Sequence, residues 1–207
     1  MIYIIGGSPR GGKSILAKKL GKKINAPYVS TDFLKLMIRP YFKGTQKDKM
    51  FPFDKIWKNL DINDYLRDYT GKQMLNIDIQ ESKTIWPGVK LFISHTNKCK
   101  MDYVIEGVHL LPGLVKSFQG DPNIRIIFLT KKEEEKIYHG LLKNRSGRDW
   151  VLDNAKDKEA LKLFSKALSE HGKYFQKETA KYNFKLINTE DNFPDKINQA
   201  IAYLTKK

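Results

Sequence analysis

The residues most suited to chemistry lie near the start of the chain, in the stretch Gly6-Gly7-Ser8-Pro9-Arg10-Gly11-Gly12-Lys13-Ser14. Its glycines, lysine and serine fit the spacing G-x-x-x-x-G-K-[ST] of a phosphate-binding loop. Such glycines let backbone N–H groups turn toward a polyphosphate, the lysine reaches the terminal phosphates, and the serine hydroxyl is a ligand for Mg²⁺. The motif predicts a site for ATP and Mg²⁺ whose nucleotide-binding residues are Gly7, Arg10, Gly11, Gly12, Lys13, Ser14 and Ile15.

The segments on either side of the loop fit this interpretation. Residues 2–5 form an apolar run typical of a strand buried on both faces, and the apolar residues of 15–20 recur at helical spacing. The N-terminus of that helix would add its dipole to the anion site. A glycine-rich turn without a ligand is the structural alternative.

Other candidate residues lie further along the chain. Asp32 follows a short apolar run and is a candidate to accept the proton of a substrate hydroxyl, with an ordinary helix N-cap as the alternative. Arg39 lies two helical turns later, where it would bind an anionic group of the acceptor. Gln80 is a further candidate for the acceptor pocket.

Two more candidates follow the third apolar run. Glu106 ends that run, where a carboxylate contacts Mg²⁺ through water or binds substrate, unless it is a strand-end acid facing solvent. His109 would donate to a phosphate or carboxylate of the substrate, unless its role is structural. Together with Ser14, Glu106 is the predicted metal site. His95, His139 and His171 are predicted to be packing or surface residues.

Two arginines are candidates for a catalytic lid. Arg145 and Arg148 flank a Ser-Gly pair, and each would neutralise charge on a phosphoryl group in transfer. With Lys13 and Asp32 they complete the predicted catalytic set. The alternative is a helix C-terminus followed by a solvated turn.

Strands and helices alternate along the chain. Strands are expected at residues 2–5, 27–30, 102–107, 124–129 and 184–188. Helices are expected at 13–23, 33–38, 65–79, 84–96, 157–182 and 194–204, and one more follows Thr130, which forms a capping box with Glu133. Residues 41–61 lack clear periodicity and suggest a mobile connection. The alternation predicts a parallel α/β sheet that binds ligands beyond the C-terminal ends of its strands.

Composition limits the class of protein. The 207 residues suit one domain, the single Cys99 rules out an intramolecular disulfide, and neither a membrane-spanning run nor a signal-peptide pattern is found, so a cytoplasmic protein without a membrane partner is expected. The net charge of +15 raises nucleic acid as a partner. Lysines are spread over nearly every expected helix, which favours compositional bias instead.

A family resemblance rests on three stretches: the GGSPRGGKS loop, the run Ser30-Thr31-Asp32 with Arg39 behind it, and Ile105-Glu106-Gly107-Val108-His109-Leu110-Leu111-Pro112-Gly113. They resemble 2-phosphoglycerate kinase, within the nucleoside-monophosphate-kinase-like P-loop kinases. The resemblance implies a single three-layer domain over residues 1–207 with a five-stranded sheet in the order 2-3-1-4-5. It also implies a helical substrate-binding insertion at 41–98, a short lid at 143–157, and a monomer or homodimer.

Three functions are compatible with these features. The first is an ATP- and Mg²⁺-dependent kinase acting on a small anionic metabolite, similar to 2-phosphoglycerate, or on a nucleotide. The second is a kinase acting on polynucleotide ends or another large acceptor, supported by the charge. The third is a non-enzymatic regulatory NTP-binding protein. Against a GTPase, Asn97-Lys98-Cys99-Lys100 lacks the aspartate of the guanine-reading N-K-x-D pattern.

Overall fold

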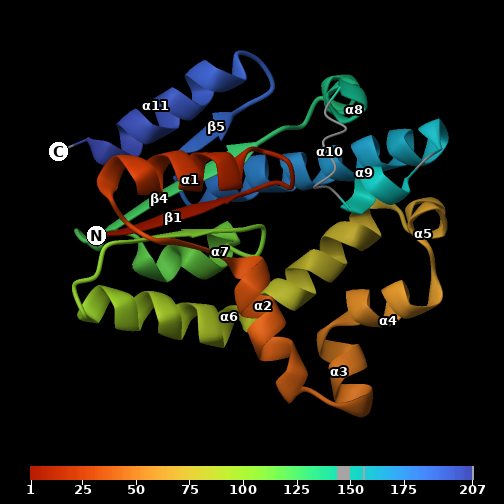
Figure 1. Cartoon of the computed structure of the whole chain (residues 1–207), viewed down its shortest axis with the longest axis horizontal. Coiled ribbons are helices and arrows are strands. Elements are labelled where there is room, and N and C mark those ends of the chain that lie inside the picture. Colours follow the sequence, from red (N-terminus) through yellow and green to blue (C-terminus); the bar gives the residue numbers. More distant parts are fainter. Residues whose placement is uncertain (144–149, 156, 207) are drawn as a thin grey trace.

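The computed structural model describes residues 1–143, 150–155 and 157–206. Within them, five parallel strands form one sheet in the order β2-β3-β1-β4-β5 (Figure 1). The strands are β1 (Ile2–Gly7), β2 (Tyr28–Ser30), β3 (Tyr103–Glu106), β4 (Ile124–Thr130) and β5 (Leu186–Asn188). The predicted α/β fold and strand order are therefore confirmed.

Helices cover both faces of the sheet. On one face α1 (Lys13–Ile24) and α11 (Phe193–Thr205) pack against side chains such as Ile5 and Ile127. On the other face α6 (Gly71–Lys98), α7 (Pro112–Val115) and α10 (Lys158–Lys181) pack against Ile4 and Ile126. Neighbouring residues of a strand point to opposite faces, so the continuous apolar runs of β1 and β4 fill two cores. The three layers are visible in Figure 1.

Shorter elements connect these layers. In chain order they are α2 (Thr31–Ile38), the 3₁₀ turn η1 (Arg39–Tyr41), α3 (Gly44–Met50), α4 (Pro52–Asn59), α5 (Ile62–Asp68), the 3₁₀ turn η2 (Lys116–Phe118), α8 (Glu134–Lys143) and α9 (Trp150–Asn154). No helix in the described part of the chain is both long enough and apolar enough to cross a membrane.

Residues 41–61, where no regular element was predicted, contain the helices α3 and α4. Phe51, between the two helices, is fully buried and packs edge-on against Phe42, with 5.4 Å between ring centroids. Each helix is too short to show an apolar period in sequence. Burial of Phe51 fixes the fold of the segment.

The two helices predicted at 65–79 and 84–96 have the wrong boundaries, because the chain forms α5 and then one long helix, α6. Asp61 caps α5, and a capping box between Thr70 and Gln73 begins the single helix α6, which runs through Pro87. A proline inside a helix removes one hydrogen bond. Ile85 and Val89 on either side of it are buried against the sheet, and this packing holds the helix together across the break.

The capping box predicted at Thr130 and Glu133 is wrong. Thr130 is the last residue of β4, and its hydroxyl donates to the carbonyl oxygen of Gly172 at 3.2 Å. Helix α8 begins only at Glu134. The backbone N–H groups of Lys132 and Glu133 instead donate to the Glu190 carboxylate, which comes from beyond β5. A distant residue thus takes the place of the local cap.

Candidate functional site

The phosphate loop is a tight turn between β1 and α1. Gly7 and Gly12 have positive φ angles of 131° and 95°, and Arg10 between them has φ of 58°. A Cβ on Gly7 would lie 1.9 Å from the Leu129 carbonyl oxygen, so the loop passes too close to β4 for any side chain. The Ser8 N–H donates to that carbonyl at 3.0 Å. Positions 7 and 12 therefore require glycine.

Lys13 begins α1 and is buried. Its Nζ donates to the Ser8 carbonyl oxygen at 2.8 Å, across the mouth of the loop. Burial lowers the pKa of Lys13, while the charges of Glu106, Asp32 and Asp78 act to raise it. Three carboxylates therefore favour the charged form of this buried ammonium group.

Ser14 and Glu106 form the predicted metal pair. The Ser14 hydroxyl donates to Glu106 Oε1 at 3.0 Å, and burial raises the pKa of Glu106 while Lys13 opposes that rise. Among the described residues, no three His, Cys, Asp or Glu side chains gather as a metal site by themselves. Mg²⁺ bound to a nucleotide needs only one or two protein oxygens. A hydroxyl and a carboxylate beside a phosphate loop fit that requirement.

Asp32 and His109 lie together near the loop. Asp32 Oδ1 is 3.5 Å from His109 Nδ1, and Thr31 Oγ1 is 2.9 Å from the same nitrogen. Ser30 is the N-cap of α2, since its hydroxyl accepts from the Asp32 N–H, so the Asp32 carboxylate does not cap the helix. That carboxylate is 70% exposed, whereas burial lowers the pKa of His109 to about 4. The result is an open carboxylate beside a neutral imidazole.

Gly107 allows this arrangement. Its φ is 156°, and a Cβ there would lie 1.7 Å from Thr31 Oγ1. The backbone of the Glu106–His109 stretch can therefore approach the start of α2 closely. Strand register places the two segments side by side, because Ser30 pairs with Glu106 in the sheet.

The predicted acceptor residues Arg39 and Gln80 lie on other elements. Arg39, in η1, donates through Nη1 to Asp54 Oδ1 at 2.9 Å, and Lys47 lies 3.3 Å from the other oxygen of Asp54. Gln80, exposed on α6, donates to the backbone carbonyl of Lys49. Neither contact joins them to Asp32 or Glu106, and their roles stay predictions. Arg145 and Arg148 lie outside the described residues.

Two partly buried ion pairs were not predicted from the sequence. Lys35 on α2 pairs with Glu81, which also accepts from the Phe53 N–H at 3.0 Å. His171 on α10 pairs with Asp78 at 2.8 Å. His171 is buried on α10, as predicted for a packing residue, but its pairing with Asp78 was not predicted. The partners are 46 and 93 residues apart, so no short motif connects them.

The opposite side of the loop is lined by cations and aromatic rings. The Arg10 guanidinium lies 5.8 Å from the Phe164 ring centroid, and burial lowers the pKa of Arg10 to about 10. Lys131 Nζ lies 5.5 Å from the centroid of Phe193, whose ring also covers Gly12. Thr189 ties the far segment to the loop by donating to the Gly11 carbonyl oxygen at 2.9 Å. Positive charge next to flat apolar faces suits a nucleotide.

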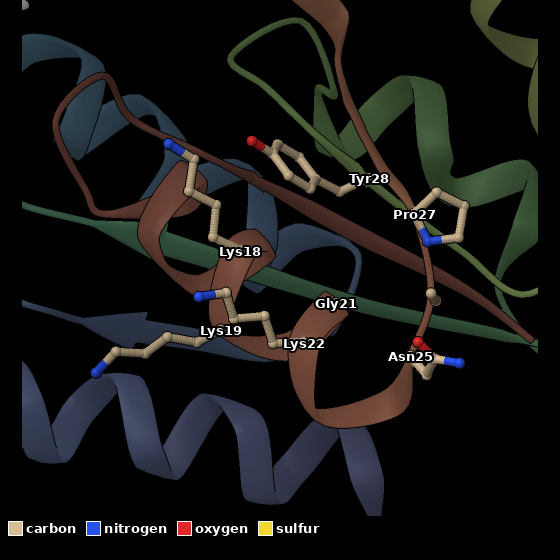
Figure 2. Close-up of a pocket in the computed structure, with 8 residues that line it drawn as sticks. Lys18, Lys19, Gly21, Lys22, Asn25, Pro27 and Tyr28 are labelled. Atoms are coloured by element: carbon tan, nitrogen blue, oxygen red, sulfur yellow. The ribbon is translucent and has the colours of Figure 1, made fainter.

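A separate groove of about 670 Å³ lies at the C-terminal end of α1, where α1 leads into β2 (Figure 2). Lys18, Lys19 and Lys22 extend from the helix, and Lys18 lies beside Tyr28. The phosphate loop lies at the other end of α1. The groove is therefore distinct from the candidate active site.

No protein-family model matches the chain, and no curated protein matches its sequence. Among solved structures, a gluconokinase from Sinorhizobium meliloti 1021 aligns with a TM-score of 0.50 at 10% identity, over 99% of this chain and 91% of that one. A deoxyadenosine kinase from M. mycoides gives 0.48 at 13% identity, over the whole of both chains. A shikimate kinase from Bacteroides thetaiotaomicron gives 0.46 at 13%, over 100% and 96%. At 10% identity the likeness to the gluconokinase concerns the fold alone.

Proposed function

We propose that this protein is an ATP- and Mg²⁺-dependent phosphotransferase that moves the γ-phosphoryl group to a hydroxyl of a small acceptor. The observation that carries the proposal is an exposed carboxylate, that of Asp32, near the phosphate loop. Its negative charge acts to raise the pKa of Lys13 in that loop. A regulatory NTP-binding protein needs the loop but has no use for an exposed carboxylate on its acceptor side.

In the proposed reaction, Asp32 accepts the proton of the acceptor hydroxyl as its oxygen bonds to the γ-phosphorus. The bond from that phosphorus to the β–γ bridging oxygen breaks, and its electron pair leaves with ADP. Lys13 stabilises the negative charge on the bridging oxygen and the phosphoryl group. Ser14 and Glu106 would hold Mg²⁺, which supplies charge neutralisation at the phosphates. His109 orients Asp32 through the 3.5 Å contact.

The acceptor is proposed to be anionic, as 2-phosphoglycerate or a nucleotide would be. Among the described residues, Arg39 and Lys47 both pair with the one carboxylate of Asp54, so these three side chains together carry a positive charge. Residues 41–98 would form the acceptor-binding lobe, and residues 143–157, with Arg145 and Arg148, would form the lid. Both assignments follow from the family resemblance.

The test is a screen for acceptor-dependent ADP release with Mg-ATP and a panel of small hydroxylated anions. Wild-type protein should release ADP with at least one acceptor. Lys13→Ala should reduce turnover by about a hundredfold to a thousandfold, because it removes a cation that contacts the transferring group. The matched control is Lys19→Ala, an exposed lysine on the same helix, which should leave turnover unchanged. Tight Mg-ATP binding without turnover on any acceptor would favour the regulatory alternative.

The net charge of +15 supports a second candidate, a kinase for polynucleotide ends. Binding of such an acceptor depends steeply on salt, because phosphate contacts release counterions. Phosphorylation of a 5′-hydroxyl oligonucleotide, lost on raising the salt concentration, would favour this candidate. The control is the same assay with a small acceptor at both salt concentrations. If salt leaves the small-acceptor reaction unchanged, it weakens oligonucleotide binding and does not inhibit the phosphate loop.

A further inference from the structure

The ion pair between Asp78 and His171 joins a carboxylate to a histidine whose two ring nitrogens both face hydrogen-bond acceptors. His171 Nε2 donates to Asp78 Oδ2 at 2.8 Å, and His171 Nδ1 donates to the Ala167 carbonyl oxygen at 2.8 Å. Since both ring nitrogens face acceptors, the imidazole carries two protons and a positive charge. Burial acts to lower the pKa of His171, but the hydrogen bond and charge of Asp78 outweigh it and raise that pKa.

The two members of the pair differ in exposure. The His171 side chain is 6% exposed, whereas the Asp78 side chain is 35% exposed. In the described part of the chain, Oδ2 is the carboxylate oxygen that bonds His171, and Oδ1 makes no other hydrogen bond. The imidazolium therefore fixes one oxygen of Asp78 and leaves acceptor capacity on the other.

Asp78 lies one turn before Glu81 on α6, on the side of the helix where Glu81 pairs with Lys35 of α2. Its charge acts on Lys13 in the phosphate loop and on His109 beside Asp32. Lys35, whose ammonium group pairs with Glu81 one turn further along α6, in turn acts to lower the pKa of Asp78. Asp32 precedes Lys35 by one turn of α2, and Asp78 precedes Glu81 by one turn of α6, so the Lys35–Glu81 pair brings the two aspartates onto the facing sides of these helices.

The support beneath Asp78 is rigid. Gly172, next to His171, lies so close to the chain after β4 that an added Cβ would be 1.9 Å from the Lys131 carbonyl oxygen. The Ser169 hydroxyl donates to the Lys132 carbonyl oxygen at 2.6 Å. The Lys131 N–H in turn donates to Ser8 Oγ in the phosphate loop at 3.2 Å. Helix α10 therefore holds His171, and through it Asp78, in fixed relation to the phosphate loop.

We propose that Asp78, held by His171, binds a second hydroxyl of the phosphoryl acceptor, so that the acceptor is an anionic polyol such as a sugar phosphate or a ribonucleotide. This inference rests on the proposed phosphotransferase function. Asp32 contacts the hydroxyl that is phosphorylated, the Arg39 and Lys47 cluster binds the anionic group, and Asp78 accepts a hydrogen bond from a neighbouring hydroxyl. Asp78 is a binding residue here, and His171 is a positioning residue.

The experiment compares acceptors that differ by one hydroxyl. Ribose 5-phosphate and the ribonucleoside monophosphates are each paired with the 2-deoxy or 2′-deoxy compound, and 2-phosphoglycerate serves as an acceptor with one hydroxyl. Wild-type protein should prefer a hydroxylated member by roughly tenfold to a hundredfold in kcat/KM, as expected for a hydrogen bond to a charged group. This preference is measured on the unaltered protein, so it stands even if a variant misfolds.

Asp78→Asn should raise the KM for the preferred acceptor by a similar factor and abolish the preference, with the KM for ATP unchanged. His171→Gln, which retains one N–H donor, should lose part of the preference. Glu170→Gln removes a charge from the exposed face of α10, where Glu170 pairs with Lys173, and should change neither constant.

The outcomes separate the two proposals. Turnover of 2-phosphoglycerate or the deoxy compounds at rates equal to the hydroxylated ones, or an Asp78→Asn variant that keeps the preference, overturns the role of Asp78 and leaves the phosphotransferase function intact. Mg-ATP binding without turnover on any acceptor overturns both. A variant that loses thermal stability but keeps the acceptor preference would show that the pair is only a structural brace.

Discussion

Ser14 and Glu106 are 92 residues apart in sequence, yet the hydroxyl and the carboxylate are 3.0 Å apart. Ser14→Ala removes one proposed metal oxygen, and we expect kcat/KM for Mg-ATP to fall by about a hundredfold. Ser14→Thr, which keeps the hydroxyl, should retain most activity because the loop motif accepts either residue. ADP release measured over a range of Mg²⁺ concentrations checks this. Equal Mg²⁺ dependence in Ser14→Ala and wild type would exclude Ser14 as a metal ligand.

His109 gives a second prediction at this scale. Its pKa falls from 6.5 to about 4 on folding, because burial disfavours the charged ring. Between pH 6.5 and about 4, the histidine binds a proton in the unfolded chain but not in the native state. The free energy of unfolding therefore decreases as the pH falls through this range. Between pH 7 and pH 5 this group costs about 2 kcal/mol.

His109→Gln should lose about 2 kcal/mol less stability than wild type between those two pH values, measured by urea unfolding. The exposed His139, replaced in the same way, is the control and should behave as wild type. The charged groups facing His109 are present in all three proteins, so their effects cancel in the comparison: Asp32, Lys35, Asp78 and Lys13. An unchanged acid sensitivity in His109→Gln would mean that His109 titrates normally.

The sequence allowed prediction of the residues whose partners follow from local spacing or from a strand end. Lys13 and Ser14 belong to one short motif, and Glu106 ends a strand beside it. Asp78 and Glu81 had no such signal. Both lie on the long helix α6. Asp78 pairs with His171 and Glu81 pairs with Lys35, and each partner lies on another helix. Only tertiary packing brings such pairs together.

At the scale of elements, α10 supports the loop segment after β4. Gly172→Ala would place a methyl group 1.9 Å from the Lys131 carbonyl oxygen, and we expect a loss of about 3 kcal/mol. Gly140→Ala, within α8, meets no described atom within 4 Å and should add about 0.5 to 1 kcal/mol through helix propensity. Chemical unfolding of the two variants checks this contrast. Similar stabilities would show that α10 does not press on this segment.

Most strands and the long helix α10 could be predicted because their apolar periods are long and regular. The exceptions each have a physical cause. Helices α3 and α4 depend on one buried ring, Phe51, and Pro87 is tolerated inside α6 because its neighbours are buried. Thr130 matched a capping box, but sheet pairing with Asn188 keeps it in β4. Tertiary contacts overrode a local preference at every one of these places.

At the scale of the whole molecule, the strand order creates the site. β1 lies between β3 and β4, so the chain leaves the centre of the sheet in opposite directions, and the C-terminal ends of four strands meet at one edge. The phosphate loop, Ser30, Glu106 and Thr130 all end strands at that edge. The lysines that produce the charge of +15 are mostly elsewhere, including the groove at the far end of α1.

The most direct test of the account is to follow the γ-phosphoryl group itself by ³¹P NMR, with Mg-ATP and the best acceptor from the screen. Wild-type protein should convert the γ-phosphate signal into a phosphoester of the acceptor. Asp32→Asn should slow this transfer by about a hundredfold to ten-thousandfold, with ATP binding unchanged. Formation of inorganic phosphate alone by wild type, or transfer at the wild-type rate by Asp32→Asn, would contradict the account.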